Sequence, residues 1–137
     1  MINTLKRISC DEHGCFSEFT FDGDDSPSMV MAEHAYQDEN GVWSPKIQPG
    51  TYDCVRGQHE LHSGPVETFE VTGVAGHSGI LCCHAGNYPQ VDSDGCCLAG
   101  SVILDSAVGK MVTNSKASYL SFMARLEGID TFQLVVI

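Results

Sequence analysis

The stretch Thr131-Phe132-Gln133-Leu134-Val135-Val136-Ile137 is the clearest structural signal in the sequence. Apolar side chains occupy every second position from 132 to 136, and this period of two is typical of a strand with one face in the core. Phe19 and Phe21 flank Thr20 in the same way. Both patterns favour a protein built mainly from strands.

Short apolar runs bounded by Gly, Pro, Asp or Ser recur along the whole chain, and each predicts a strand. The eight runs are Ile2–Ile8, Cys15–Phe21, Met29–Ala35, Thr51–Val55, Thr68–Val71, Ile80–His84, Leu98–Leu104 and Thr131–Ile137. We therefore predict a mainly β (β-rich α+β) fold. It would be a compact mixed sheet or barrel-like sandwich of about eight short strands, forming one domain over residues 1–137.

One segment, Ser115–Glu127, has the spacing of a helix. Its apolar residues fall at i, i+3, i+4 and i+7, namely Tyr119, Phe122, Met123 and Leu126. Asn114 or Ser115 could cap its start, and Gly128 could end it. We expect this helix to pack on the sheet, with the stripe as core material.

Charge limits the partners that the chain can bind. The 137 residues carry 18 acidic and 7 basic side chains, a formal net charge of −11. Nucleic-acid affinity comes mainly from clustered Lys and Arg, so nucleic acid and anionic membranes are not expected partners. Nine of the acids precede residue 41, and Asp22–Pro27 among them predicts an exposed acidic loop.

No membrane span or leader is predicted. No run reaches the 18 apolar residues of a membrane helix, and Met1–Arg7 lacks the apolar core of a signal peptide. We expect a soluble protein, located in the cytoplasm of a bacterial host or in a phage particle. The sequence does not determine the oligomeric state.

Seven cysteines are too many and too unevenly spaced for a complete set of disulfides, because the number is odd and Cys82-Cys83 and Cys96-Cys97 are adjacent. Without a signal peptide, we expect a reducing compartment in which most of them pack as small apolar residues.

The densest group of reactive residues lies between Gly76 and Gly100. An apolar run ends in His84, a glycine turn follows, and Cys96 comes directly after a second glycine turn at Gly95. A cysteine nucleophile needs a base to remove its proton and N–H donors for the oxyanion, and turns offer free backbone N–H groups. His84 and Cys96 could meet these needs.

Strand alternation sorts the neighbouring residues. In a strand over Ile80–His84, Cys82 and His84 would share one face, while Leu81 and Cys83 share the other. Cys83 is then a core residue. Cys82 would lie beneath His84 as a supporting residue or, in an oxidising setting, as a disulfide partner.

These segments resemble the catalytic signature of L,D-transpeptidase (YkuD-type) domains, and more closely a small family of phage and bacterial proteins related to them. The matching segments are Ile47–Tyr52, Gly79–Asn87 and Asp92–Gly100. The resemblance runs from Arg7 to the C-terminal strand and is most specific between residues 79 and 100. Two positions differ. Asp94 stands where transpeptidases carry His, and Cys97-Leu98 where they carry Arg or Asn.

The resemblance implies a catalytic site. Cys96 would be the nucleophile, His84 its base, and Gly95 with neighbouring amides the oxyanion site. Supporting or binding residues would be Gly86, Asn87, Ser93, Asp94 and Cys82. The substrate would be a peptidoglycan stem peptide, attacked through a Cys96 thioester that passes to an amine or to water. No cofactor or metal is expected.

Other interpretations stay open. The chain could be a non-catalytic structural or adaptor protein of a phage virion, contacting other virion proteins. Adjacent Asp92 and Asp94 should disfavour a thiolate at Cys96. A zinc site built on Cys10, His13 and Cys15 with Cys54 or Cys82, or one at His59 and His62, is a weaker alternative, because neither set has the usual ligand spacing.

Overall fold

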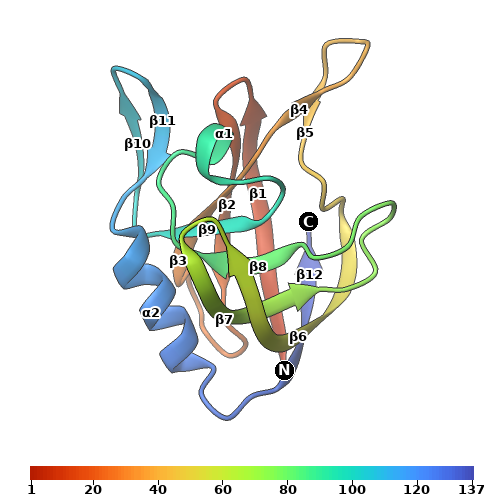
Figure 1. The fold of residues 1–137 in the computed structure, drawn as a ribbon, viewed down its shortest axis with the longest axis vertical. Coiled ribbons are helices and arrows are strands. Elements are labelled where there is room, and N and C mark those ends of the chain that lie inside the picture. The colour runs from red at the N-terminus through yellow and green to blue at the C-terminus, as the bar shows by residue number, and fades with distance from the viewer.

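The computed structural model describes all residues from Met1 to Ile137 and is organised around a closed eight-stranded barrel. Its strands are β1 (Ile2–Asp11), β2 (Gly14–Thr20), β3 (Met29–Glu33), β6 (Gly50–Leu61), β7 (Gly64–Val71), β8 (Leu81–His84), β9 (Cys97–Gly100) and β12 (Thr131–Val136). Their order around the barrel is β1-β12-β6-β7-β8-β9-β3-β2 (Figure 1). The mainly β fold predicted from the sequence is confirmed.

Two of the eight strand pairs are parallel. β1 runs parallel to β12, and β8 runs parallel to β9, whereas the other neighbours are antiparallel. The parallel β8–β9 pair matters for the site, because both strands point the same way and the segment between them must run back along the pair to the start of β9. That return segment contains the short helix α1 (Pro89–Asp92).

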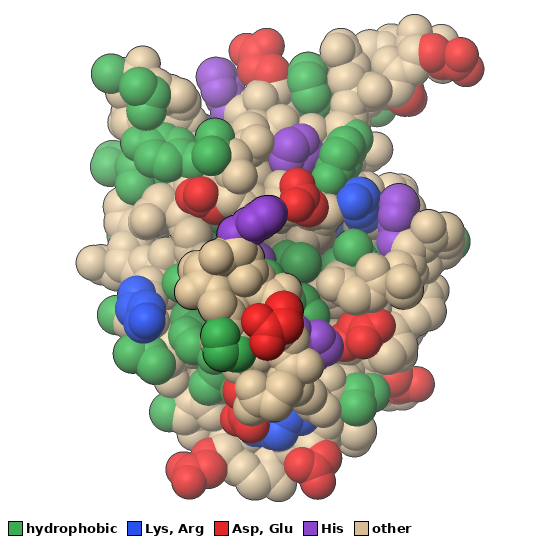
Figure 2. All heavy atoms as spheres, viewed as in Figure 1, with side chains coloured by type: hydrophobic (Ala, Val, Ile, Leu, Met, Phe, Trp, Pro, Cys, Tyr) green, Lys and Arg blue, Asp and Glu red, His purple; other side chains and the backbone are tan.

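Two small hairpins project from one end of the barrel (Figure 1). They are β4 (Tyr36–Gln37) with β5 (Trp43–Ser44), and β10 (Ile103–Ser106) with β11 (Gly109–Val112). Apolar side chains gather over the β10–β11 hairpin in Figure 2, where Val102, Leu104 and Val108 are exposed. Acidic side chains are scattered over the same face, with few basic ones between them.

The barrel interior and helix α2 (Ser115–Arg125) form one core. Alternation holds in β12, where Phe132, Leu134 and Val136 are buried. The predicted helical stripe also faces inward, with Phe122 fully buried among four aromatic rings of the barrel, the closest being Phe19 at a centroid distance of 5.5 Å. No helix is long and apolar enough to cross a membrane.

The predicted side-chain cap of α2 is wrong. Asn114 precedes the helix in a left-handed conformation with φ 52°, and its side chain makes no cap hydrogen bond. Its Nδ2 donates instead to Ser101 Oγ. Ser115 Oγ accepts the N–H of Gly86, which ties the start of α2 to the segment after His84. Gly128 follows the helix with φ 77°, as expected for a glycine at a helix end.

Candidate active site

His84 and Cys96 line the same cleft, which has a volume of about 580 Å³. His84 is the last residue of β8, and Cys96 directly precedes β9. Residues of α1, of the β6–β7 turn and of the first turn of α2 complete the walls, among them Val91, Asp92, His62, Ser63 and Lys116. The cleft therefore joins segments from 61 to 116 that are far apart in the sequence.

A bulge in β8 determines how His84 is presented. Cys82 pairs with Cys97, but His84 pairs with the next residue, Leu98, so Cys83 is an extra residue with φ 91°. The Thr68 hydroxyl donates to the carbonyl groups of Cys82 and Cys83. A non-glycine residue at positive φ costs on the order of 1–3 kcal/mol and persists where its surroundings hold it.

The alternation predicted for Ile80–His84 fails at this bulge. Cys82 and Cys83 both belong to the barrel core, whereas they were expected on opposite faces. The expectation that Cys83 is a core residue is confirmed, since its side chain is fully buried. The extra residue shifts the register by one, and that shift explains the failure.

Three fully buried thiols meet inside the barrel beside the site. Cys82 contacts Cys54 and Cys97, and burial together with these neighbours raises the pKa of the Cys82 thiol well above its usual value. No group of three or more His, Cys, Asp or Glu side chains is arranged to hold a metal ion. Cys10 and Cys15 form a disulfide across the β1–β2 hairpin, and His59 lies on strand β6, so the residues of the two zinc alternatives are not assembled.

The turn before Cys96 is fixed by Ser93. Its hydroxyl donates to the Cys96 carbonyl at 2.6 Å and accepts the Gly95 N–H at 3.1 Å, and only 2% of Ser93 is exposed. Gly95 has φ 126°, a conformation that favours glycine. These contacts hold the backbone of Gly95 and Cys96, and so the position from which the Cys96 side chain starts.

His84 has the tautomer that a general base needs. Its Nδ1 lies 2.9 Å from the Ala85 carbonyl oxygen, and because a carbonyl can only accept, Nδ1 carries the proton. Nε2 is then left with the lone pair. Burial lowers the pKa of His84, although the Ala85 carbonyl and Asp92 oppose that shift. The imidazole is therefore neutral at neutral pH.

Cys96 is a protonated thiol at rest. Burial raises its pKa to about 11, and Cys97 and Asp94 act in the same direction. The N–H of Leu81, 3.2 Å from Sγ, and the charge of Lys46 lower it. The site therefore holds a neutral thiol and a neutral imidazole rather than an ion pair, and any attack by the sulfur would require the thiol proton to leave.

Of the backbone N–H groups expected to form the oxyanion site, those of Gly95 and its neighbours, not all are free. The N–H of Gly95 is already bonded to Ser93 Oγ. The N–H groups of Asp94 and Cys96 have no acceptor within the protein. They are the backbone groups near the sulfur that remain available to an oxyanion.

The other predicted site residues mostly shape the cleft. Gly86 and Asn87 line it, and Asn87 Nδ2 donates to the Val112 carbonyl at 2.8 Å. Gly86 is closely packed, because a Cβ there would lie 2.9 Å from the Asp92 Cβ. Asp92 Oδ2 accepts the N–H groups of Asn87 and Tyr88, so it holds the return segment. Asp94 also lines the cleft.

Sequence reasoning missed three polar residues of the site. His62 and Ser63 come from the β6–β7 turn, and Lys116 from the first turn of α2. His62 attracted attention only as half of a weak zinc motif, and nothing in the sequence distinguished Lys116 from a solvent-exposed helix residue.

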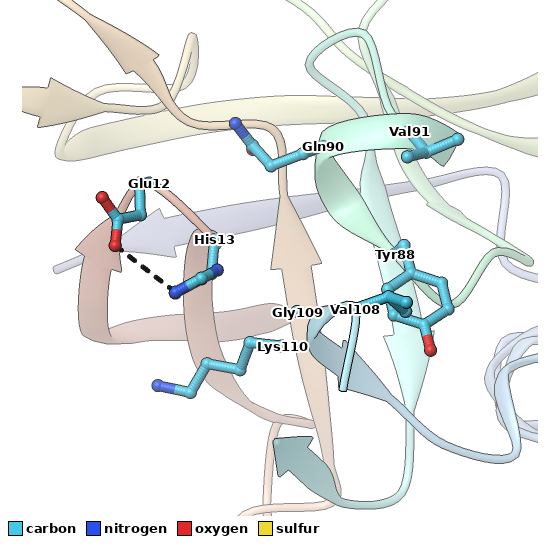
Figure 3. Close-up of a pocket in the computed structure, with 8 residues that line it drawn as sticks. All are labelled: Glu12, His13, Tyr88, Gln90, Val91, Val108, Gly109 and Lys110. Carbon is cyan, nitrogen blue, oxygen red and sulfur yellow. Dashed lines mark ion pairs between the residues drawn. The ribbon is translucent and has the colours of Figure 1, made fainter. Parts of the chain in front are cut away.

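A second, smaller pocket of about 120 Å³ lies beside the first. Figure 3 shows it between the β1–β2 turn, α1 and the β10–β11 hairpin, with His13 Nε2 3.5 Å from Glu12 Oε1 and Lys110 nearby. Val91 borders both pockets. No cysteine lines the smaller one, whereas Cys96 lines the larger cleft.

No family model, curated protein or solved structure matches the chain.

Proposed function

We propose that this protein is a cysteine-dependent acyltransferase or hydrolase with Cys96 as nucleophile and His84 as base. The observation that carries the proposal is the hydrogen bond from His84 Nδ1 to the Ala85 carbonyl, which leaves Nε2 unprotonated in the cleft shared with Cys96. The low pKa of His84 keeps that nitrogen available at neutral pH.

The proposed reaction has two stages, the formation of a thioester on Cys96 and its transfer to an acceptor. His84 Nε2 takes the thiol proton while Cys96 Sγ bonds to the substrate carbonyl carbon, and the N–H groups of Cys96 and Asp94 stabilise the oxyanion. The C–N bond then breaks, the amine leaves with the proton from His84, and a thioester remains. An amine or water next attacks the thioester, again with His84 as base, and the thiol is restored.

The substrate class follows from the resemblance of Gly79–Asn87 and Asp92–Gly100 to transpeptidase segments. We propose a peptidoglycan stem peptide, with either an amine or water as acceptor. Arg or Asn follows the cysteine in transpeptidases, but Cys97 and Leu98 are fully buried here and offer no polar contact to a substrate. Carboxylate recognition would have to come from elsewhere in the cleft.

Digestion of purified peptidoglycan and of a synthetic tetrapeptide stem tests the proposal. Wild type should release free amine or cross-linked product, and Cys96→Ala and His84→Ala should lose at least a hundredfold in rate. Cys54→Ala removes a buried thiol that does not line the cleft and serves as the matched control. Adding a free amino acid as acceptor separates transfer from hydrolysis, since only transfer incorporates it.

If wild type, Cys54→Ala and Cys96→Ala are equally inactive on both substrates, the enzymatic proposal fails. The second candidate is then a non-catalytic structural or adaptor protein of a phage virion. The pKa of about 11 bears only on the non-catalytic part of this candidate, because Cys96 holds little thiolate at neutral pH. Stoichiometric presence in purified particles would support this candidate, and absence from them would remove it.

A further inference from the structure

Lys46 lies along the turn that precedes Cys96. It stands between Pro45 and Ile47, both buried, in the segment that leads from β5 to β6. Its Nζ donates to the Asp94 carbonyl oxygen at 2.6 Å. Its aliphatic chain covers Gly95 closely, because a Cβ at Gly95 would lie 2.6 Å from Lys46 Cδ. The side chain therefore follows the backbone of the turn.

A second contact holds the same turn from the same direction. His34 Nδ1 donates to the Ser93 carbonyl at 2.8 Å, and the His34 ring stacks on Tyr36 with centroids 4.3 Å apart. The ammonium of Lys46 lies 5.1 Å from the centroid of that Tyr36 ring. The segment from 34 to 46 thus binds two successive carbonyl groups of the turn, those of Ser93 and Asp94.

Lys46 also acts on the sulfur electrostatically. Its charge lowers the pKa of Cys96, against the effects of burial, Cys97 and Asp94. The charged or titratable groups that face the sulfur or line the cleft are His62 of the β6–β7 turn, His84 of β8, Asp92 of α1, Asp94, Cys97 of β9, Lys116 of α2 and Lys46 itself. A thiolate that forms during attack would be stabilised by a cation fixed in this position.

We propose that Lys46 is a positioning residue for Cys96, fixing the Ser93–Gly95 turn through the Asp94 carbonyl and placing a positive charge near the sulfur. The importance of this role for catalysis rests on the function proposed above. The effect on the thiol itself does not, because alkylation of Cys96 can be measured without any substrate.

Alkylation at pH 8, followed by mass spectrometry of the Cys96 peptide, tests the proposal. Cys96 is partly exposed, whereas the other four free thiols are fully buried, so the native protein should label at Cys96. Iodoacetamide and iodoacetate are used in parallel, because one reagent is neutral and the other is an anion. The variants are Lys46→Met, Lys46→Arg and, as a control, Lys6→Met, which removes the charge of an exposed lysine of β1 outside the cleft.

Lys46→Met should slow the reaction with iodoacetamide roughly threefold. Without the ammonium the pKa of the Cys96 thiol rises and less thiolate is present at pH 8, but the greater nucleophilicity of the more basic sulfur offsets part of that loss. The reaction with iodoacetate should slow by a clearly larger factor, because this anion also loses its attraction to the ammonium of Lys46. Lys46→Arg should stay within about twofold of wild type, and Lys6→Met should be unchanged.

Two outcomes would overturn the proposal. If Lys46→Met reacts like wild type with both reagents, the residue does not act on Cys96. If Lys46→Arg, which keeps the charge, slows both reactions as much as Lys46→Met does, the charge of Lys46 has no influence on the sulfur. The proposed function is judged separately: a charge effect in alkylation without peptidoglycan digestion rejects only the enzyme, and digestion by wild type without an alkylation effect rejects only the role of Lys46.

Discussion

Glu33 is the buried acid whose ionisation the fold resists most clearly. Both of its oxygens accept hydrogen bonds from Arg7 Nη2, at 2.8 and 2.9 Å, and its side chain is fully buried. Burial nevertheless raises its pKa from 4.5 to about 7, with Arg7 opposing the shift. The folded protein therefore binds this proton more tightly than the unfolded chain does.

The sign of the pH dependence follows. The contribution of Glu33 to the unfolding free energy is fully present below pH 4.5, its pKa in the unfolded chain. It is lost as the pH rises through about 7, its pKa in the folded protein. At 1.36 kcal/mol per pKa unit the loss is about 3 kcal/mol. Urea unfolding of wild type and Glu33→Gln at several pH values between 4.5 and 8 measures it. The difference between the two unfolding free energies should change by about that amount, and parallel curves would contradict the prediction.

At the scale of single elements, helix α2 contributes to the barrel core mainly through Phe122. Phe122→Ala should lower the unfolding free energy by about 3–5 kcal/mol, because the cavity would be surrounded by barrel rings that cannot close around it. Leu120→Ala on the same helix is the control, since Leu120 is 55% exposed and should change stability by less than about 0.5 kcal/mol. Urea unfolding at constant pH measures both. Equal effects would mean that α2 is not part of the cooperative core.

A comparison of predicted and observed strands shows which parts of the fold the sequence pattern could predict. Each of the eight predicted strands overlaps a different barrel strand, because each barrel strand has an inward face that must be apolar. Two predicted bounds are wrong: Leu98–Leu104 runs past the end of β9 into β10, and Thr51–Val55 covers only the first part of β6. The hairpins β4–β5 and β10–β11 were not predicted, since they project from the barrel and carry no regular inward face. A mixed sheet or barrel-like sandwich was predicted, but the pairing that closes the barrel was not, because the parallel β1–β12 pair joins the two ends of the chain.

The candidate site also has some features that the sequence predicts and others that only the folded barrel creates. His84 and Cys96 could be found because the segments that present them have local signals, a strand end and a glycine turn. The bulge at Cys83 could not be predicted, because it depends on the register of β8 against β9 and on Thr68 of the neighbouring strand β7. Lys46 reaches the turn from 48 residues away in the sequence, so only the folded barrel brings it there.

At the scale of the whole molecule, the excess of acidic groups should oppose folding. The net charge is −11, and only three Arg–carboxylate pairs are present, Arg7–Glu33, Arg56–Glu67 and Arg125–Asp24. Most carboxylates therefore repel one another across the surface. Salt screens such repulsion, since the Debye length falls from about 30 Å at 0.01 M to about 8 Å at 0.15 M.

We expect the unfolding free energy to rise by about 1 kcal/mol when potassium chloride increases from 10 to 150 mM at pH 7.5. The double variant Asp25→Asn, Glu39→Gln provides the control. Both residues are exposed and form no salt bridge, and their replacement reduces the net charge from −11 to −9. Its salt dependence should be smaller than that of wild type. Replacing potassium by choline should leave the wild-type effect unchanged, because screening depends on ionic strength and not on a bound cation. A stability that falls with salt, or a variant as salt-dependent as wild type, would mean that other interactions outweigh the surface repulsion.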